Sequence, residues 1–338
     1  MRNSRRSKAI FIFLVCSFLG IPSARSQSQH TANLIEGAKK EGEVVVYGTM
    51  SLPDANQLNA KFREKYPFLD VKLNRLGSGK FVPRVIAELR ANKHLADILQ
   101  TNSLSLHYLK KEGFLGQYLS VEDRFFPKQY KEQGYWTTTN INVHVVAYNP
   151  KLLSREKLPR TFDDLLNPVW KGKMVLDPSE QWSALMFQIM GKEKALRYLR
   201  ELAKQNILLR RESSSMRAQL IAAGEAPMDI DSTLGPVEEL KKRRAPVDWI
   251  TLGPVPVVTS AHAIAVRPLH PNAAKLYLDF VLSKEGQRTV LNFGRQVART
   301  DLLAEQEVIK NLELVPLDPR AGETMDYHAN LAREIFQQ

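Results

Sequence analysis

The stretch Glu43-Val44-Val45-Val46-Tyr47-Gly48 is an apolar, β-branched run that ends at a glycine. Such a run, bounded by a turn signal, is typical of a buried strand in a parallel sheet. Residues 53–66 then carry apolar side chains at helical spacing, and residues 69–73 form a second strand-like run. A strand, a helix and a strand in this order predict an α/β fold with a mostly parallel sheet.

The same alternation continues to Gly113 and then starts again. A third strand is predicted at residues 96–99, between helices that begin after Gly79 and at Ser103. The second series has predicted strands at residues 143–148, 173–176, 206–209, 227–231 and 261–266, with helices between and after them. Two successive α/β units predict two domains.

The first 26 residues have the organisation of a secretory signal peptide. Four basic residues precede an apolar run from Ala9 to Gly20, and Ala24 and Ser26 are the small residues expected at a signal-peptidase site. The apolar run has about a dozen residues, whereas a membrane-spanning helix needs about twenty. We therefore expect export to the periplasm and removal of residues 1–26; a retained membrane anchor is the alternative.

Removal of this segment changes the composition of the chain. The formal net charge is +12, and residues 1–26 hold five basic and no acidic residues, so the mature chain carries +7. The densest basic run, residues 241–244, ends a predicted helix, and it lacks the aromatic interleaving of a nucleic-acid site. The one cysteine, Cys16, is also removed, which excludes disulfides. We expect no nucleic-acid partner and no stable membrane insertion.

The sequence lacks the motifs of common enzymes. It contains no Gly-x-Ser-x-Gly and no His-Glu-x-x-His, and its seven histidines have no metal-ligand spacing. Gly77-Ser78-Gly79-Lys80 lacks the first glycine and the hydroxyl residue of a phosphate loop. We expect no enzymatic activity, no bound metal and no cofactor, although an acid–base pair far apart in the sequence stays open.

Small polar residues recur between the end of a predicted strand and the start of a helix. In open α/β sheets ligands bind beyond the carboxyl ends of the strands, where helix N-termini favour anions. Each loop alone is explained by helix capping, but several together predict a shared polar cleft. The loops are residues 48–51, 77–80, 101–103, 177–181, 213–215 and 231–233.

Five segments carry a resemblance to a known family: residues 44–48, 146–152, 167–173, 223–225 and 284–287. In this order, behind a signal peptide, they resemble the periplasmic solute-binding proteins of ABC importers. More narrowly, the chain resembles the ferric-iron-binding branch of the family 1 extracellular solute-binding proteins. The resemblance covers nearly all of the mature chain.

The resemblance implies a two-lobed periplasmic-binding-protein fold of type II. Each lobe is a mostly parallel sheet flanked by helices, and two strand crossovers, near Asn140–His144 and Thr259–Ala263, form the hinge. The implied N-terminal lobe is residues 27–141 with 260–300, and the C-terminal lobe is residues 142–259 with 301–338. Hinge closure would trap a solute and deliver it to a membrane permease and its ATPase, and we expect a monomer.

The resemblance also bears on the ligand. Ferric-binding relatives supply adjacent tyrosines after the strand that matches residues 228–231, and here those positions are Leu234 and Gly235. No histidine follows the first strand, and no acid follows the third. Ferric iron prefers phenolate, carboxylate and imidazole ligands, so we expect a small anionic organic solute instead. Glu180 departs from this expectation, because its carboxylate would repel an anion or select a cationic group.

The predicted ligand-binding residues come from the loops and from positions where the resembling proteins hold an anion. They are Thr49, Ser51, Ser78, Lys80, Thr101, Asn102, Asn142, Ser179, Glu180, Gln181, Ser214 and Ser232. Lys80, Arg84 and Arg211 are candidate counter-charges. Tyr47, Trp182 and Tyr148 are candidate aromatic lining.

The predicted function is the periplasmic solute-binding component of an ABC transporter. One alternative is a protein that binds ferric iron or an iron chelate. A second is a secreted α/β enzyme that acts on a small anionic substrate through Asp177, Glu180 or His144. A signalling role through a partner sensor shares the fold and differs only downstream.

Overall fold

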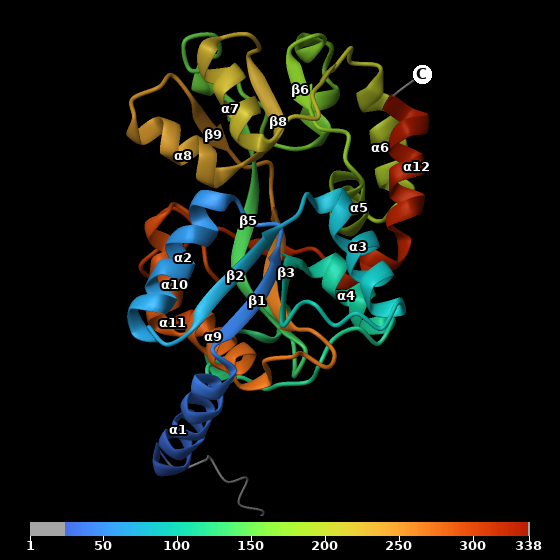
Figure 1. Cartoon of the computed structure of the whole chain (residues 1–338). Coiled ribbons are helices and arrows are strands. Elements are labelled where there is room, and N and C mark those ends of the chain that lie inside the picture. Colours follow the sequence, from blue (N-terminus) through green and yellow to red (C-terminus); the bar gives the residue numbers. More distant parts are fainter. Residues whose placement is uncertain (1–23, 337–338) are drawn as a thin grey trace, which may run out of the picture.

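The computed structural model describes residues 24–336 of the 338-residue chain. Its elements form two groups, one above the other in Figure 1, joined by two long strands. The predicted signal peptide lies outside the described residues except for its last three, which begin α1. No helix in the described part of the chain is long and apolar enough to cross a membrane.

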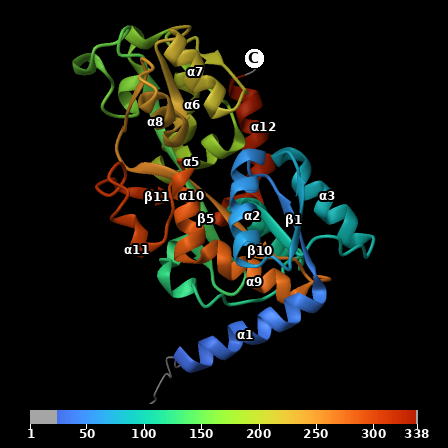
Figure 2. The same cartoon turned by 60° about the vertical axis from the view of Figure 1, so that its left-hand side comes forward.

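The first lobe is built on a sheet of order β2-β1-β3-β10-β5. β1 is parallel to β2 and to β3, as the alternation of strands and helices predicts. Helix α1 packs on α9 and projects from the bottom of this lobe (Figure 2). The elements are α1 (Ala24–Glu41), β1 (Glu43–Gly48), α2 (Leu52–Lys65), β2 (Asp70–Arg75), α3 (Ser78–Arg90), β3 (Ile98–Asn102), α4 (Ser103–Lys111), β4 (Lys131–Glu132), α9 (Pro271–Leu282), α10 (Lys284–Asn292) and α11 (Thr300–Leu303).

The second lobe contains a smaller sheet in which β8 is parallel to β6, and β6 is parallel to β7. Helices α5, α6 and α12 pack together on one side of it, and α7 and α8 lie on the other (Figure 1). The elements are β6 (Met174–Leu176), α5 (Glu180–Met190), α6 (Lys192–Ala203), β7 (Leu208–Leu209), α7 (Ser214–Ala223), β8 (Met228–Thr233), α8 (Leu234–Lys242), β9 (Asp248–Ile250) and α12 (Met325–Phe336).

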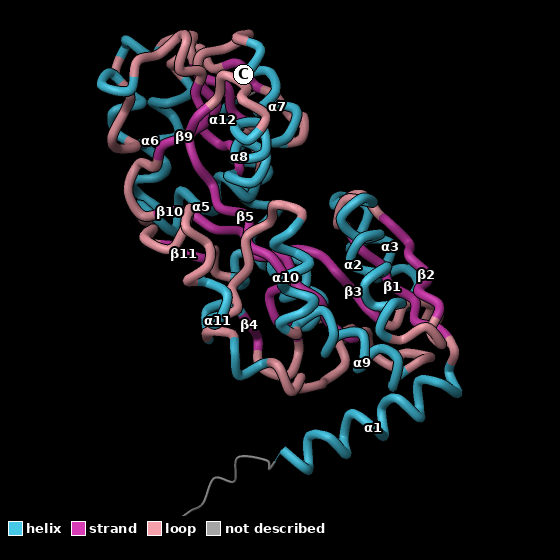
Figure 3. Tube along the Cα trace, turned by 90° about the vertical axis from the view of Figure 1, so that its left-hand side faces the viewer, coloured by secondary structure: helices cyan, strands magenta, loops and turns pink. Residues whose placement is uncertain are grey.

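Two antiparallel strands, β5 (Trp136–Tyr148) and β10 (Val255–Ile264), connect the lobes. The first half of β5 pairs with β10, and its second half pairs with β8 and β9 of the other sheet. Figure 3 shows β5 between the two lobes. Both implied crossovers lie inside these strands, so the type II fold is confirmed. β11 (Leu314–Pro316) runs parallel to β10 and carries the chain toward α12.

Both crossing strands begin earlier than the apolar patterns predict. β5 begins at Trp136, although its residues 137–140 and Asn142 are polar, and β10 begins at Val255. The four residues 137–140 are nevertheless buried. An apolar run therefore locates only the half of β5 that lies in the second lobe, since the first-lobe half buries hydroxyl and amide side chains.

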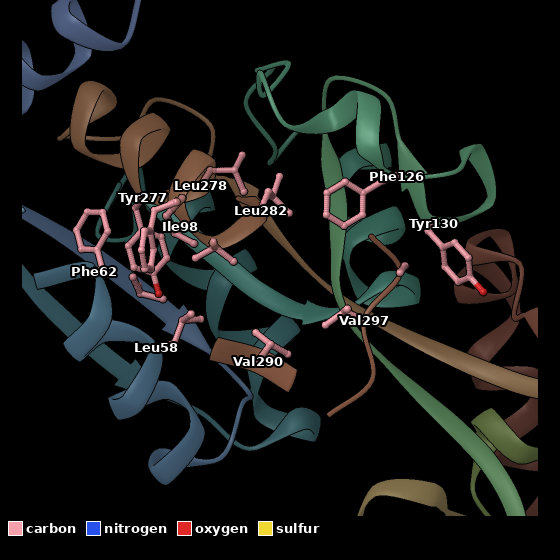
Figure 4. Packing of buried hydrophobic residues seen from close by; sticks show 14 of the residues in the cluster. Leu58, Phe62, Ile98, Phe126, Tyr130, Tyr277, Leu278, Leu282, Val290 and Val297 are labelled. Atoms are coloured by element: carbon pink, nitrogen blue, oxygen red, sulfur yellow. The ribbon is translucent and has the colours of Figure 1, made fainter. Parts of the chain in front are cut away.

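Each lobe has its own large hydrophobic cluster. In the first, Phe62 packs edge-on against Tyr277 at 5.0 Å between ring centroids, with Leu58 and Ile98 nearby (Figure 4). The second is centred on residues from β6, α5 and α6 and includes Trp182. Burial of such side chains contributes about 1.5–3 kcal/mol each relative to exposure, so each cluster stabilises its own lobe.

The exact lobe boundaries stay a prediction, but one segment packs differently from the expectation. The resemblance places residues 301–338 in the C-terminal lobe, yet Leu302 and Ile309 are buried in the hydrophobic cluster of the first lobe. Only the later part, with Leu331 and Ile335 of α12, packs in the second cluster. The apolar side chains of residues 302–314 thus hold that segment to the first lobe before the chain crosses.

Candidate functional site

A polar hollow of about 240 Å³ lies where the two lobes and the two crossing strands meet. Ten of its lining residues carry a neutral or charged polar side chain from the first lobe or the crossing strands, and Gln181 comes from the second lobe. The lining residues are Thr49, Met50, Ser51, Asp54, Ser78, Gln100, Asn102, Asn140, Asn142, Gln181, Val258, Ser260 and Arg295.

A row of three polar residues crosses the sheet beneath this hollow. Ser260 of β10 is in register with Asn102 of β3 on one side and with Asn140 of β5 on the other. Neighbouring residues in such a row lie on the same face of the sheet, about 5 Å apart. We call Asn102, Ser260 and Asn140 the amide row.

Gln100 fixes the loop that follows β1. Its side-chain Oε1 accepts hydrogen bonds from the backbone N–H groups of Thr49 at 2.9 Å and Met50 at 2.8 Å. A Cβ at Gly48 would lie 3.0 Å from the same oxygen, so a glycine permits this close approach. The loop is therefore held by a buried side chain, and Thr49 and Ser51 are presented to the hollow.

A neutral histidine lies behind Gln100. His262 of β10 and Gln100 line the same small internal cavity, and the His262 Nδ1 is 2.6 Å from the hydroxyl of Thr139. Burial lowers the pKa of His262 to about 3, because the imidazolium would lose its hydration. This side of the hollow is therefore supported by uncharged groups at neutral pH.

Helix N-termini surround the hollow. Ser51 caps α2 by accepting from the N–H of Asp54, and Asn102 caps α4 by accepting from the N–H of Ser105. Ser78 is the first residue of α3, whose cap position is Gly77 and has no side-chain cap. N-terminal turns carry partial positive charge and N–H donors, so they favour an anionic group.

The charged part of the lining is one ion pair. The Nε and Nη2 of Arg295 donate to Asp54 Oδ2 at 3.1 and 2.8 Å. Arg295 Nη1 makes no hydrogen bond with any residue in the range 24–336. Both residues also line a wider cleft of about 990 Å³ between α2, α8 and α10, so the pair stands where the hollow meets this cleft.

The strand ends of the second lobe hold a different arrangement, which we call the Arg217 network. Arg217 of α7 is buried; its Nε donates to Asp229 at 3.0 Å, and its Nη1 lies 3.6 Å from Asp177. Asp231 accepts from Arg217 through its backbone carbonyl, and its carboxylate is 2.7 Å from His144 Nδ1. Three carboxylates thus share one guanidinium.

Burial dominates the titration of Asp177 and Asp229. It raises the pKa of Asp177 to about 6 and that of Asp229 to about 6, while the charge of Arg217 acts in the opposite direction. The carboxylate of Asp231 adds to both increases by repulsion. The network is therefore a self-contained charge cluster, and its members are engaged with one another.

The structure brings six of the twelve predicted ligand-binding residues together in the polar hollow: Thr49, Ser51, Ser78, Asn102, Asn142 and Gln181. The other six do not line it. Thr101 and Ser232 are buried, and Lys80 and Glu180 stand on the first turns of α3 and α5. Ser179 caps α5, and the Ser214 hydroxyl bonds Thr233. For these two residues helix capping and local bonding account for the side chain.

The candidate counter-charges lie outside the hollow. Arg84 pairs with Glu88 at 2.8 Å and covers the ring of Tyr47, and Lys80 and Arg211 are exposed. The candidate aromatic residues Tyr47, Trp182 and Tyr148 are buried in hydrophobic clusters. These aromatic side chains pack in the lobes and do not line the hollow, and the counter-charge candidates stay a prediction.

Seven residues of the hollow were not predicted from the sequence: Met50, Asp54, Gln100, Asn140, Val258, Ser260 and Arg295. Gln100, Asn140, Val258 and Ser260 stand inside strands, whereas most of the predicted residues belong to the loops between strands and helices. Arg295 follows α10, far from every polar loop. A search for polar residues at inward positions of the crossing strands would have found Asn140 and Ser260.

The positions of the absent ferric ligands are occupied by other contacts. Leu234 is buried in the first cluster, and a Cβ at Gly235 would lie 3.1 Å from the carbonyl of Gly294. Among residues 24–336 no group of three or more His, Cys, Asp or Glu side chains is arranged to hold a metal ion.

The fold and the hollow define a class, the two-lobed solute-binding proteins of the type II periplasmic-binding fold. A family model described as bacterial extracellular solute-binding protein matches residues 93–301. The chain belongs to this family, and its function is that of the solute-binding component of an ABC transporter.

Two relatives match most of the chain. An uncharacterised protein of Haemophilus influenzae is 26% identical over 295 residues, which are 80% of this chain and 81% of that protein. A probable ABC transporter periplasmic-binding protein, y4fP, of Sinorhizobium fredii is 25% identical over 272 residues, or 74% of each chain.

Solved structures share the fold. Iron-bound HitA from Pseudomonas aeruginosa has a TM-score of 0.77 and 22% identity, and covers 87% of this chain and 99% of its own. AfuA from Actinobacillus pleuropneumoniae, with fructose-6-phosphate bound, has a TM-score of 0.75 and 24% identity, and covers 88% of this chain and 99% of its own. At these identities the likeness shows the fold alone.

Proposed function

We propose that the protein binds a small anionic organic solute in the polar hollow between its lobes and releases it to a membrane permease, without chemical change. The observation that carries this proposal is the origin of the lining. Residues of the first lobe, of both crossing strands and of α5 surround one hollow, so a bound solute contacts the parts that move together on closure.

The anionic character follows from the donors that surround the hollow. The N-termini of α2, α3 and α4 present N–H groups there, and Arg295 Nη1 has no hydrogen-bond partner in the part of the chain that the structure describes. The one carboxylate of the lining, Asp54, is already paired with Arg295. Amides and hydroxyls dominate the rest, and these are poor ligands for ferric iron.

The periplasmic location of the protein and the delivery of its solute to a permease are supported by the N-terminal sequence and by a relative. The basic n-region and short apolar run of the first 20 residues support export, and the relative y4fP is named as a periplasmic-binding protein of an ABC transporter. A binding protein that closes around its solute needs a permease that accepts the closed form. We therefore propose a periplasmic protein that works with an ABC permease and its ATPase.

Substitutions of the two members of the Arg295–Asp54 pair should change the affinity for an anionic solute in opposite directions. Arg295→Gln removes a charge-assisted donor, which is worth about 1.5–3 kcal/mol, so affinity for an anionic solute should fall about 10- to 100-fold. Asp54→Asn frees the guanidinium and should raise that affinity. The matched control is Arg200→Gln, on the exposed face of α6, which should leave it unchanged.

The measurement is isothermal titration calorimetry of the exported protein. Candidates are first selected by thermal shift from sugar phosphates, hydroxy acids, amino acids and ferric citrate. Mass spectrometry of the recovered solute then shows whether it is unchanged. Equal effects of Arg295→Gln and Arg200→Gln contradict the anion site, and product formation contradicts the binding-protein function.

A further inference from the structure

Two buried carboxamides in the polar hollow have hydrogen-bonding groups that no protein group satisfies. Gln100 is 3% exposed and Asn140 is 7% exposed. Gln100 Nε2 and both polar atoms of the Asn140 side chain make no hydrogen bond with any residue in the range 24–336. These atoms are not fully enclosed by the protein, so they open to the hollow and are available to water or to a bound solute.

The orientation of two amides is fixed by their other bonds. Gln100 Oε1 accepts from Thr49 and Met50, and Asn102 Oδ1 accepts from the N–H of Ser105. The remaining groups, Gln100 Nε2 and Asn102 Nδ2, are therefore donors. Asn140 and Ser260 each offer both a donor and an acceptor. A matching solute group must accept hydrogen bonds on the side of β3, and it can also donate hydrogen bonds on the side of β5.

The amide row has the length of a molecule and not of a single ion. It crosses three neighbouring strands, which at about 4.8 Å a step gives about 10 Å from Asn102 to Asn140. Among neutral organic groups, a hydroxyl both donates and accepts one hydrogen bond and fits such a row. A bare anion such as phosphate is too short to span the row and fills one end only.

We propose that Gln100, Asn140 and Ser260 contact the solute and select one that carries several hydroxyl groups beside its anionic group. This inference rests on the proposed function and adds a division of labour to it. Arg295 and the helix N-termini bind the charge, whereas Gln100 and the amide row bind the neutral hydroxylated part.

The test compares probes of equal charge that differ in hydroxyl groups. D-Gluconate against hexanoate, and glycerol 3-phosphate against propyl phosphate, are titrated calorimetrically into the full-length exported protein. The hydroxylated member of a pair should bind at least about tenfold tighter, since each satisfied hydrogen bond is worth about 0.5–1.5 kcal/mol.

Variants then assign this preference to residues. Asn140→Leu, which keeps the side-chain size, should abolish the preference while the affinity for the unhydroxylated probe stays within about twofold. Ser260→Ala is a second, milder variant that should reduce the preference. The matched control is Asn311→Leu, at an exposed position outside the hollow, which should retain it. Circular dichroism confirms that each variant is folded.

The outcomes separate this proposal from the one on which it rests. Equal affinity for both members of a pair, or equal losses for both in Asn140→Leu, overturns the selection of hydroxyl groups and leaves the anion site standing. If no anion binds the wild-type protein at all, both proposals fail. Loss of only the hydroxylated probe in Asn140→Leu supports the inference.

Discussion

The two lobes place the carboxyl ends of their strands at the same cleft, but they use different chemistry there. In the first lobe these ends carry neutral amides and hydroxyls, several of which have no hydrogen-bond partner within the described residues 24–336. In the second lobe they carry the Arg217 network, whose charges pair with one another. The difference separates side chains that stabilise a lobe from side chains available to a solute, although both occupy equivalent places in the fold.

Among the tests of this contrast, Arg217→Met should have the largest effect on stability. It removes the guanidinium and leaves Asp229 and its neighbours buried without a cation, so the free energy of unfolding should fall by about 3–5 kcal/mol. Arg295→Met, at the half-buried pair with Asp54, should cost about 1 kcal/mol at most. Denaturant unfolding followed by circular dichroism measures both, and equal costs would show that the two pairs play the same part.

A pH titration tests the neutral side of the cleft. The pKa of His262 is about 3 in the folded protein, below the ordinary value of 6.5, so below pH 6.5 the unfolded chain binds a proton that the folded protein excludes. Stability is therefore lost as the pH falls, by about 3 kcal/mol between pH 7 and pH 4.5. His262→Gln should flatten this slope, and His94→Gln, at a partly exposed histidine, serves as the control. An unchanged slope in His262→Gln would contradict the assignment.

The smallest expected effect on stability comes from Asp177, and its dependence on pH is opposite in sign to that of His262. Its folded pKa, about 6, lies above the ordinary 3.8, so the folded protein holds this proton more tightly than the unfolded chain. Ionisation then costs stability as the pH rises from about 4 to 6. Asp177→Asn should therefore stabilise the protein by about 1 kcal/mol at pH 7.5, allowing for its partial exposure, and by nothing at pH 4.

Thermal unfolding at the two pH values measures this difference, with the exposed Asp163→Asn as the matched control. Destabilisation of Asp177→Asn at pH 7.5 would mean that its attraction to Arg217 outweighs its burial. The Arg217 network would then depend on all three carboxylates.

Much of the fold could be predicted because packing leaves a pattern in the sequence. The β-branched run at residues 43–48 and the alternation after it identify β1 and its neighbours, since parallel strands are buried on both faces. The first-lobe half of β5 could not be found in this way. Its residues 137–140 are buried but polar, so they lack the apolar signal that identifies a strand.

The candidate site was half predictable for a related reason. Thr49 follows β1, and Ser78 and Gln181 stand in the first turns of α3 and α5, where the architecture alone directs them toward the cleft. Asn140 and Arg295 reach the same hollow from the middle of a strand and from the segment after α10, and only the three-dimensional arrangement unites them. Lys80 shows the converse, because it stands in the same first turn of α3 as Ser78 and yet does not line the hollow.

Helices α1 and α12 belong to different lobes, since α1 packs on α9 and α12 packs on α5 and α6. The sequence holds a single cysteine, Cys16, before α1. Cysteines introduced as Asn33→Cys and Arg333→Cys would therefore be the sole thiols after α1 begins and would stand on opposite lobes. A donor and an acceptor fluorophore at these two places form an internal ruler. Energy transfer between them would report lobe movement for any added compound before the cargo is known.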